Sequence, residues 1–343
     1  MEGTLAVISQ TGKSLSFFDL SSGSRTAHIS HLIAEPHELI HDPKRNLLYI
    51  SHSYRHGHFW VHGECSHEIS VVDVEKKEVV DIIDTRPVLS PHGMVLDQEK
   101  DVLWISYEET ENREADAGGL AAIDLGSRKV VKKVESGKKT HWFVMKPDGK
   151  KAYTCNKTAD FISILDLEKG VLTGKIAASR GTEEPGISRD GKLAYFPTPG
   201  TTLGENAVDP KVLVIDTDTD QVVHEIKLEW GVQSVYVTAK DQVMVSQYRF
   251  SANGTMEKGK LSLFDGKNYA LMGETEIGSM PLTMRDDGRG EKGFIANIFE
   301  GTVSVVDLAE GGVLKTLGVD NERDEETNSL KGAHGMVYRP SRV

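Results

Sequence analysis

The sequence predicts an all-β protein, a seven-bladed β-propeller whose four-stranded antiparallel blades form a single domain over residues 1–343. Three observations predict this fold. Short apolar strands that end in aspartate recur seven times along the chain. Each copy has room for three further short strands separated by turn residues. The two ends of the chain hold complementary parts of one blade, so that the ring can close.

The aspartates define the repeat. Each follows an apolar run such as SVVD or SILD, and successive aspartates lie 54, 51, 42, 50, 49 and 42 residues apart. Seven copies therefore account for the whole length, and a repeat of this size with four strands is typical of a propeller blade. The aspartates are Asp19, Asp73, Asp124, Asp166, Asp216, Asp265 and Asp307.

One copy shows the four strands directly. Residues 141–156, HWFVMKPDGKKAYTCN, read as a strand, a turn containing Pro-Asp-Gly and a second strand. The segments FISILDL and VLTGKIAA follow as the third and fourth strands. Alternating apolar and polar residues between Gly, Asp and Asn turns indicate antiparallel strands, and helical periodicity is weak throughout.

The ends of the chain predict how the ring closes. Three strands are expected near 4–9, 14–20 and 25–30, with no inner strand before them. The last segment, HGMVYRP at 334–340, supplies one inner strand with no partners after it. Joining these four strands in one blade, the closing blade, removes exposed sheet edges.

Composition excludes several functions. The 343 residues include 40 Lys and Arg against 52 Asp and Glu, giving a formal net charge of −12. This balance disfavours binding to nucleic acid or to an anionic membrane surface, both of which need basic surfaces. The first residues lack the pattern of a signal peptide, and the two cysteines, Cys65 and Cys155, form no disulfide framework. We therefore expect a cytoplasmic protein that acts on a small molecule.

Two turns carry a resemblance to a known family. The segments KPDGKKAYTCN (146–156) and SRDGKLAYF (188–196), each followed by an apolar strand ending in Asp, resemble the YVTN-repeat, lactonase-like propeller superfamily. The resemblance covers the whole chain and implies the propeller fold. It implies no single activity, because that superfamily includes lactonases, isomerases, lyases, metal-dependent oxidoreductases and binding scaffolds.

The residue that begins each inner strand is the strongest functional signal. Inner strands line the central channel, so equivalent positions face a common axis. We call this position the slot. Aligned on their turns, the seven inner strands give His37, His92, His141, Glu183, Val232, Met280 and His334 in the slot. Four of the 13 histidines thus share one position on neighbouring blades.

The sequence predicts that these four histidines hold one divalent transition metal. Neutral imidazoles suit Zn, Fe or Cu. The pattern resembles the four-histidine iron centre of carotenoid-cleaving propellers, in arrangement only. The alternative is a polar ring around a water-filled channel, each histidine bonded to backbone or water.

Glu183 and His52 are the predicted catalytic residues. Glu183 could complete the metal shell, orient a histidine or act as general base. A one-residue slip in the alignment would place Glu184 or Gln233 in the slot instead of Glu183 or Val232. His52 ends a second strand beside the channel mouth.

Long connections cluster on the face where the slot opens: 53–67, 107–118, 198–209, 248–258 and 318–333. Such loops usually carry function. The histidine-rich segment 52–67 is either a lid or a plain solvated loop. The predicted pocket-lining residues are Tyr107, Asn156, Gln247, Asn297, Met280 and Trp60.

Together these features predict a metal-dependent enzyme acting on a small organic molecule in the channel. We expect redox-neutral chemistry, as in a hydrolase, lyase or isomerase. The alternatives are an oxygenase with histidine-bound iron or copper, a metal-free lactonase or cycloisomerase, and a non-catalytic propeller that binds a ligand or a protein.

Overall fold

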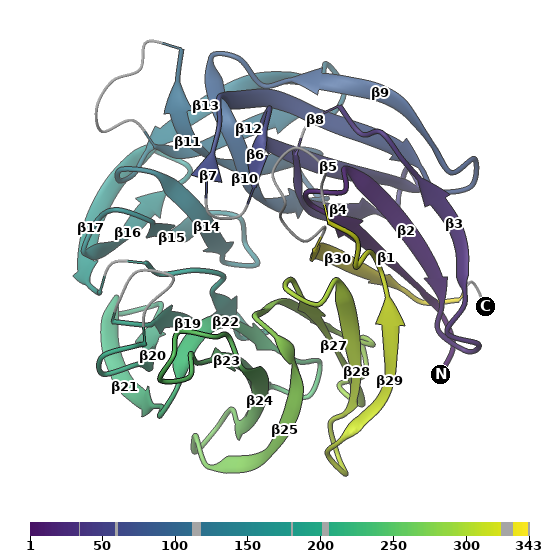
Figure 1. Ribbon diagram of the computed structural model, residues 1–343. Helices are drawn as coiled ribbons and strands as arrows, with labels where there is room; N and C mark the ends of the chain where they lie inside the picture. Colours follow the sequence, from purple (N-terminus) through teal and green to yellow (C-terminus); the bar gives the residue numbers. More distant parts are fainter. Residues whose placement is uncertain are drawn as a thin grey trace.

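A computed structural model describes residues 1–33, 35–58, 61–111, 118–179, 181–200, 206–323 and 332–341. Seven four-stranded antiparallel sheets surround a central axis (Figure 1). The predicted seven-bladed propeller is therefore confirmed. The described residues contain no helix of the length and apolarity that a membrane crossing requires.

The strands run from the channel outward in each blade. The closing blade holds β30 (Ala333–Arg339), β1 (Thr4–Ser9), β2 (Ser14–Asp19) and β3 (Arg25–Ile29). Blade one holds β4 (Glu35–Asp42), β5 (Leu47–Tyr54), β8 (Cys65–Asp73) and β9 (Glu78–Asp84). Blade two holds β10 (Val88–Asp97), β11 (Val102–Thr110), β12 (Gly119–Asp124) and β13 (Lys129–Glu135).

The remaining blades repeat this order. Blade three holds β14 (Thr140–Met145), β15 (Lys151–Asn156), β16 (Phe161–Asp166) and β17 (Val171–Ala177). Blade four holds β18 (Gly186–Ile187), β19 (Leu193–Thr198), β20 (Lys211–Asp216) and β21 (Gln221–Lys227). Blade five holds β22 (Gly231–Val237), β23 (Gln242–Tyr248), β24 (Lys258–Asp265) and β25 (Leu271–Ser279). Blade six holds β26 (Pro281–Asp286), β27 (Lys292–Asn297), β28 (Thr302–Asp307) and β29 (Val313–Gly318).

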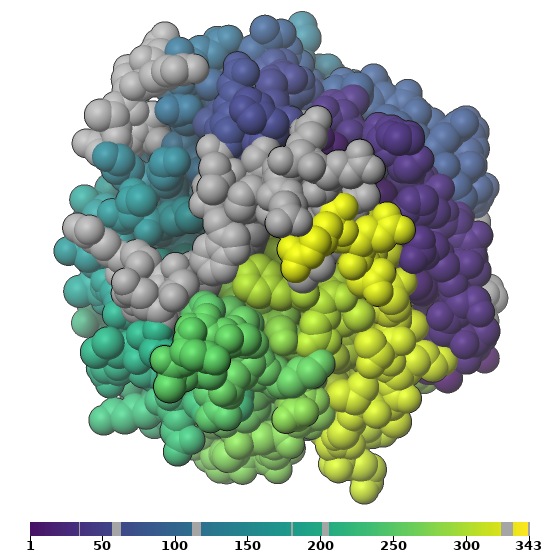
Figure 2. Space-filling model, viewed as in Figure 1, coloured from purple at the N-terminus to yellow at the C-terminus, as the bar shows by residue number. Residues whose placement is uncertain are grey.

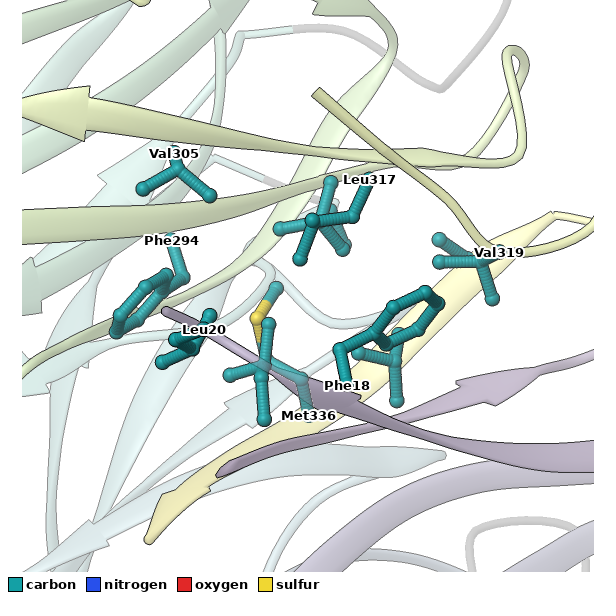
Figure 3. Packing of buried hydrophobic residues seen from close by; sticks show 12 residues of the cluster. Phe18, Leu20, Phe294, Val305, Leu317, Val319 and Met336 are labelled. Carbon is teal, nitrogen blue, oxygen red and sulfur yellow. The ribbon is translucent and has the colours of Figure 1, made fainter. Parts of the chain in front are cut away.

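Ring closure follows the prediction, because β30 pairs antiparallel with β1. In the space-filling view the C-terminal and N-terminal ends of the sequence lie against each other (Figure 2). An apolar cluster joins the closing blade to blade six, and Figure 3 shows Phe18 and Met336 facing Phe294 and Leu317 across this junction. All four side chains are at most 2% exposed. The junction is therefore as apolar and as fully buried as the core of a domain.

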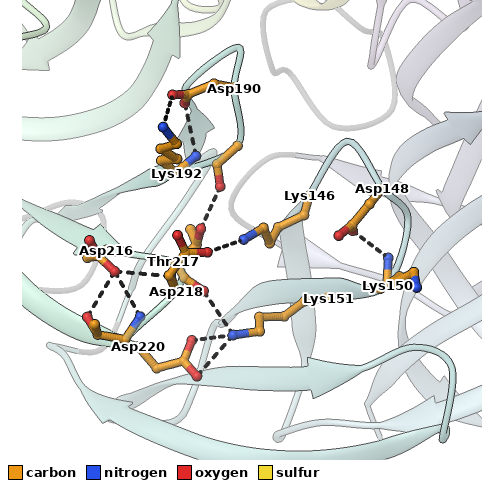
Figure 4. Close-up of polar contacts among 12 residues, drawn as sticks. Lys146, Asp148, Lys150, Lys151, Asp190, Lys192, Asp216, Thr217, Asp218 and Asp220 are labelled. Atoms are coloured by element: carbon orange, nitrogen blue, oxygen red, sulfur yellow. Dashed lines mark hydrogen bonds and ion pairs between the residues drawn. The ribbon is translucent and has the colours of Figure 1, made fainter.

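The repeated aspartates end the third strand of every blade and cap the turn that follows. A side-chain oxygen of each accepts a hydrogen bond from a backbone N–H two or three residues later. Figure 4 shows the turn at Asp216, beside the ion pairs Lys146–Asp218 and Lys151–Asp220 that join blades three and four. Aspartate favours such turns because its short side chain reaches its own backbone.

These turn hydrogen bonds predict that the folded protein loses stability as the pH falls. The turn hydrogen bonds hold the pKa of Asp166 below its usual value, and the pKa of Asp19 falls to about 2 for the same reason. The unfolded chain takes up protons first as pH falls below about 4, so this stabilisation is present above that pH and is lost toward pH 2. We expect Asp166→Ala to lower the melting temperature at neutral pH. Asp166→Asn, which keeps an acceptor oxygen, should lower it less, and equal melting temperatures for the two variants would contradict the capping role.

Candidate metal centre

A β-bulge at the start of the inner strands positions the slot residue. The pairing with the second strand shifts register between Pro36 and Leu39, between Pro91 and Met94, and between Thr140 and Phe143. His37, His92 and His141 are the first residues inside these bulges. The closing blade has a corresponding irregularity: Val7 of β1 pairs with Met336 and Ser9 pairs with Ala333, so His334 lies between the two paired residues. A bulge re-aims the side chain it contains, which is how these strands turn their histidines toward the axis.

The strand register corrects the sequence alignment in two blades. The bulge of blade five lies between Val232 and Ser234, so Gln233 occupies the slot there. In blade six the bulge lies between Pro281 and Met284, which places Leu282 in the equivalent position. The alignment of Met280 with the histidines is therefore wrong by two residues. Val232 and Met280 are fully buried in apolar clusters that join neighbouring blades, four with five and five with six respectively.

The four predicted histidines do meet at the hub. The ring centroids of His37 and His92 are 4.6 Å apart, and those of His37 and His334 are 4.8 Å apart. His92 and His334 are separated by 6.4 Å, while His92 and His141 are only 3.7 Å apart. All four residues are at most 5% exposed. Four blades therefore bring four imidazoles into one buried volume.

Three of these spacings match metal coordination. With metal–nitrogen bonds of about 2.1 Å, the centre of a bound imidazole lies about 3.2 Å from the ion. Ring centres are then about 4.5 Å apart for bonds at right angles and about 6.4 Å apart for opposite bonds, the angles of square or octahedral coordination, whereas the tetrahedral angles usual for Zn would place them about 5.2 Å apart. His37 at the corner, with His92 and His334 on opposite sides, fits this pattern. His141 lies closer to His92 than such geometry allows.

The donor atoms themselves are not gathered on one point. Within the described residues, no three His, Cys, Asp or Glu side chains form a group arranged to hold a metal ion. Both ring nitrogens of His92 are nevertheless buried and have no hydrogen-bond partner among the described residues. A buried polar group of this kind is costly unless something binds it. His92 is therefore the hub histidine whose two ring nitrogens are both open to a ligand, water included.

Burial keeps two of the hub histidines, His92 and His334, neutral. Burial, followed by the neighbouring histidines, holds the pKa of His92 well below its ordinary value. Burial likewise lowers the pKa of His334 to about 4. Neutral imidazole is the form that coordinates a transition metal.

A buried carboxylate orients His141. Glu108 Oε1 lies 2.6 Å from His141 Nδ1, and Glu108 Oε2 accepts a 2.7 Å hydrogen bond from the Tyr54 hydroxyl. Burial opposes ionisation of Glu108, but the hydrogen bond and charge of His141, together with Lys157 and Lys139, outweigh it and hold its pKa below the usual range. Carboxylates in this position fix the ring orientation of metal-binding histidines.

Similar polar groups accompany two more histidines. Glu38 Oε1 is 3.1 Å from His334 Nδ1, and the Gln10 amide nitrogen is 3.2 Å from His37 Nε2. Sequence reasoning missed Glu38, Glu108 and Gln10. Glu38 directly follows a slot histidine, and such an acidic residue on a buried inner strand was the available signal. Gln10 and Glu108 come from other strands, and the sequence alone does not show which strand ends meet.

The two glutamates of blade four have different surroundings. Glu183 Oε2 lies 3.4 Å from His141 Nε2, whereas Glu184 Oε1 accepts a 2.7 Å hydrogen bond from Arg285. The Cys155 thiol donates to the Glu183 carbonyl at 2.8 Å. Ser51 and Ser106, at the same strand position in blades one and two, donate to the carbonyls of His92 and His141. This shared contact places Glu183 in the slot.

The residues predicted at the ends of second strands occupy equivalent positions. Each is the backbone pairing partner of the residue that precedes a slot. The pairs are Pro36–His52, Pro91–Tyr107, Thr140–Asn156, Val232–Gln247 and Pro281–Asn297. Four of these side chains hydrogen-bond a serine of the third strand in their own blade, at 2.6–2.9 Å: His52 to Ser70, Asn156 to Ser163, Gln247 to Ser262 and Asn297 to Ser304.

Those contacts connect neighbouring strands of a blade. Tyr107 packs in an apolar cluster between blades one and two. The roles proposed for these residues in catalysis or in a substrate pocket stay predictions. Trp60 lies outside the described residues, and the segment around it contains a short hairpin, β6 (Gly57–His58) with β7 (Val61–His62), that the sequence did not predict.

Comparison with known proteins supports the fold. Antigen Lp49 of Leptospira interrogans is 29% identical over 192 residues, which cover 54% of this chain and 39% of that protein. The match thus spans well under half of the relative's length. Hydrazine synthase from Kuenenia stuttgartiensis superposes with a TM-score of 0.65 at 18% identity, over 82% of this chain and 79% of that chain.

A functionally unknown protein from Desulfotomaculum acetoxidans superposes over the whole of both chains, with a TM-score of 0.73 and 10% identity. At these identities the structural neighbours establish the propeller fold. No known family profile matches the chain. Membership of the YVTN-repeat, lactonase-like superfamily therefore stays a prediction.

The Glu108 contacts predict a measurable effect on stability. Glu108→Leu would leave the Tyr54 hydroxyl and the His141 N–H buried without an acceptor, so we expect the free energy of unfolding to fall by about 2–5 kcal/mol. Glu108→Gln retains one acceptor oxygen and should lose less. Urea unfolding followed by tryptophan fluorescence measures both. Equal stability of Glu108→Leu and wild type would show that Glu108 does not hold the ring.

Proposed function

We propose that the hub binds one transition-metal ion and that the protein is a metal-dependent enzyme acting on a small organic molecule. The observation that carries this proposal is His92, whose two ring nitrogens are buried without hydrogen-bond partners among the described residues. His37 and His334 flank it at ring spacings that suit a shared ion.

The residues present fit such an ion. Four imidazoles are a donor set suited to Zn, Fe or Cu. Glu108 hydrogen-bonds Nδ1 of His141, as the carboxylates that support metal-binding histidines do, while Glu38 Oε1 lies 3.1 Å from His334 Nδ1 without a hydrogen bond. A bound ion would polarise a carbonyl group or lower the pKa of a water molecule.

Redox-neutral chemistry is the proposed reaction class, with Glu183 moving the proton. Its side chain is 14% exposed and reaches within 3.4 Å of the His141 ring. It is thus the carboxylate with both access to solvent and contact with the hub. Glu184, by contrast, is held by Arg285. Cytoplasmic location and the absence of nucleic-acid or membrane partners remain part of the proposal, resting on composition.

Elemental analysis of the purified protein tests the proposal. We expect about one metal ion per chain in the wild type, and at least a tenfold loss in His92→Ala and in the His37→Ala/His141→Ala double variant. His224→Ala is the matched control, because His224 is an exposed residue of β21 whose ring stacks on Tyr269. This control should keep its metal. Circular dichroism verifies that each variant is folded.

The identity of the ion separates the reaction classes. A colourless zinc protein supports hydrolase, lyase or isomerase chemistry, whereas a coloured iron or copper protein would indicate an oxygenase or oxidoreductase. A wild-type protein that takes up none of these metals, and whose melting temperature is unaffected by a chelator, would contradict the proposal and favour a binding scaffold.

A further inference from the structure

A cavity lies toward the end of the channel opposite the histidines. The slot residues begin the inner strands, and the other ends of β22, β26 and β30 surround a cavity of about 630 Å³. Tyr236, Arg285 and Tyr338 line it. None of these three residues contacts the four histidines directly within the described part of the chain, and Glu184, which follows the slot residue Glu183, links Arg285 to the hub.

Arg285 presents an unused hydrogen-bonding edge to this cavity. Its Nη1 donates to Glu184 Oε1 at 2.7 Å and to the Met284 carbonyl at 2.6 Å. Within the described part of the chain, neither Nε nor Nη2 has an acceptor. Neither atom is among the buried polar atoms that lack a partner, so both are accessible to solvent, and the Arg285 side chain, which is 22% exposed, lines the cavity.

This edge has the shape of a carboxylate receptor. The Nε and Nη2 groups of a guanidinium point in parallel and match the two oxygens of a carboxylate. The buried pair with Glu184 fixes the other end of the group, so little conformational entropy is lost when a ligand binds. Lysine has a single donor point and cannot offer the same pair of parallel bonds.

Glu2, Asp286 and Asp287 are the acidic residues that line the cavity, and the two aspartates are already hydrogen-bonded. Asp286 accepts hydrogen bonds from the Tyr236 hydroxyl, from Ala239 N and from Gly288 N. Asp287 Oδ1 accepts from the backbone of Arg289 and Glu291. Neither aspartate forms an ion pair with Arg285 among the described residues. Their oxygens thus hold the turn after β26 and leave the free edge of Arg285 available.

Aromatic rings border the same space. The Arg285 guanidinium carbon lies 5.8 Å from the centre of the Tyr236 ring, and Tyr338 stacks on Phe294 with a centroid separation of 5.6 Å. These rings provide a flat apolar surface beside the charged edge. We propose that the cavity is a binding site for a small organic carboxylate, gripped by Nε and Nη2 of Arg285 and packed against Tyr236 and Tyr338.

Calorimetric titration with benzoate tests this site, with benzamide as the uncharged ligand of the same shape. We expect saturable binding of benzoate to the wild type and at least tenfold weaker binding of benzamide. Arg285→Lys should weaken benzoate binding about tenfold or more, because the bidentate contact is lost. The titration does not depend on a metal, so it can fail or succeed independently of the proposed function.

Two further variants keep the test decisive. Arg285→Gln/Glu184→Gln removes both charges of the buried pair and keeps its hydrogen-bonding shape, so it should fold and yet lose benzoate binding. Arg289→Gln is the control, because Arg289 lines the cavity but is 63% exposed and is paired with Asp287 and Glu291. This control should bind benzoate within a factor of about three of wild type. Absence of saturable benzoate binding, or equal affinity in Arg285→Lys and wild type, would overturn the proposal.

Discussion

Closure of the ring is the constraint on which the rest of this structure depends. Pairing β30 with β1 commits all seven inner strands to a common axis, so one position per blade is brought to the hub. The bulges then turn that position inward. A cluster of histidines that are far apart in the sequence is the direct result: His37 and His334 are neighbours only because the first and last segments share a blade.

Most of the fold could be predicted from the sequence. Aspartate recurs because each copy needs an acceptor that caps the same turn, so the repeat could be read without any knowledge of the packing. The mixed origin of the closing blade also followed from the sequence. Blade six was misaligned because its slot holds Leu282 in place of a histidine, although Pro281 precedes this slot as Pro36 and Pro91 precede theirs. Bulge positions are set by pairing with the second strand, which a single strand does not reveal.

The candidate site was predictable only in part. The slot histidines share a position within the repeat, and their convergence is therefore a property of the blade. Glu108 and Gln10 share a position within the repeat, directly after the second-strand residue that pairs with the one before a slot, but the residue types at this position differ from blade to blade, so no pattern marks them. The cavity around Arg285 left no signal at all, since its character depends on which donors of one guanidinium remain uncommitted after folding. Contacts of this kind exist only in three dimensions.

The two ends of the channel thus have opposite character. Imidazoles occupy one end, and Arg285 lies toward the other, linked to the hub by its ion pair with Glu184. Anomalous diffraction from crystals of the purified protein, recorded on both sides of the absorption edge of the metal present, tests the central idea most directly. We predict one peak about 2.1 Å from a ring nitrogen of each of the four slot histidines. No peak at the hub, with those nitrogens bonded to water and to neighbouring side chains, would contradict it.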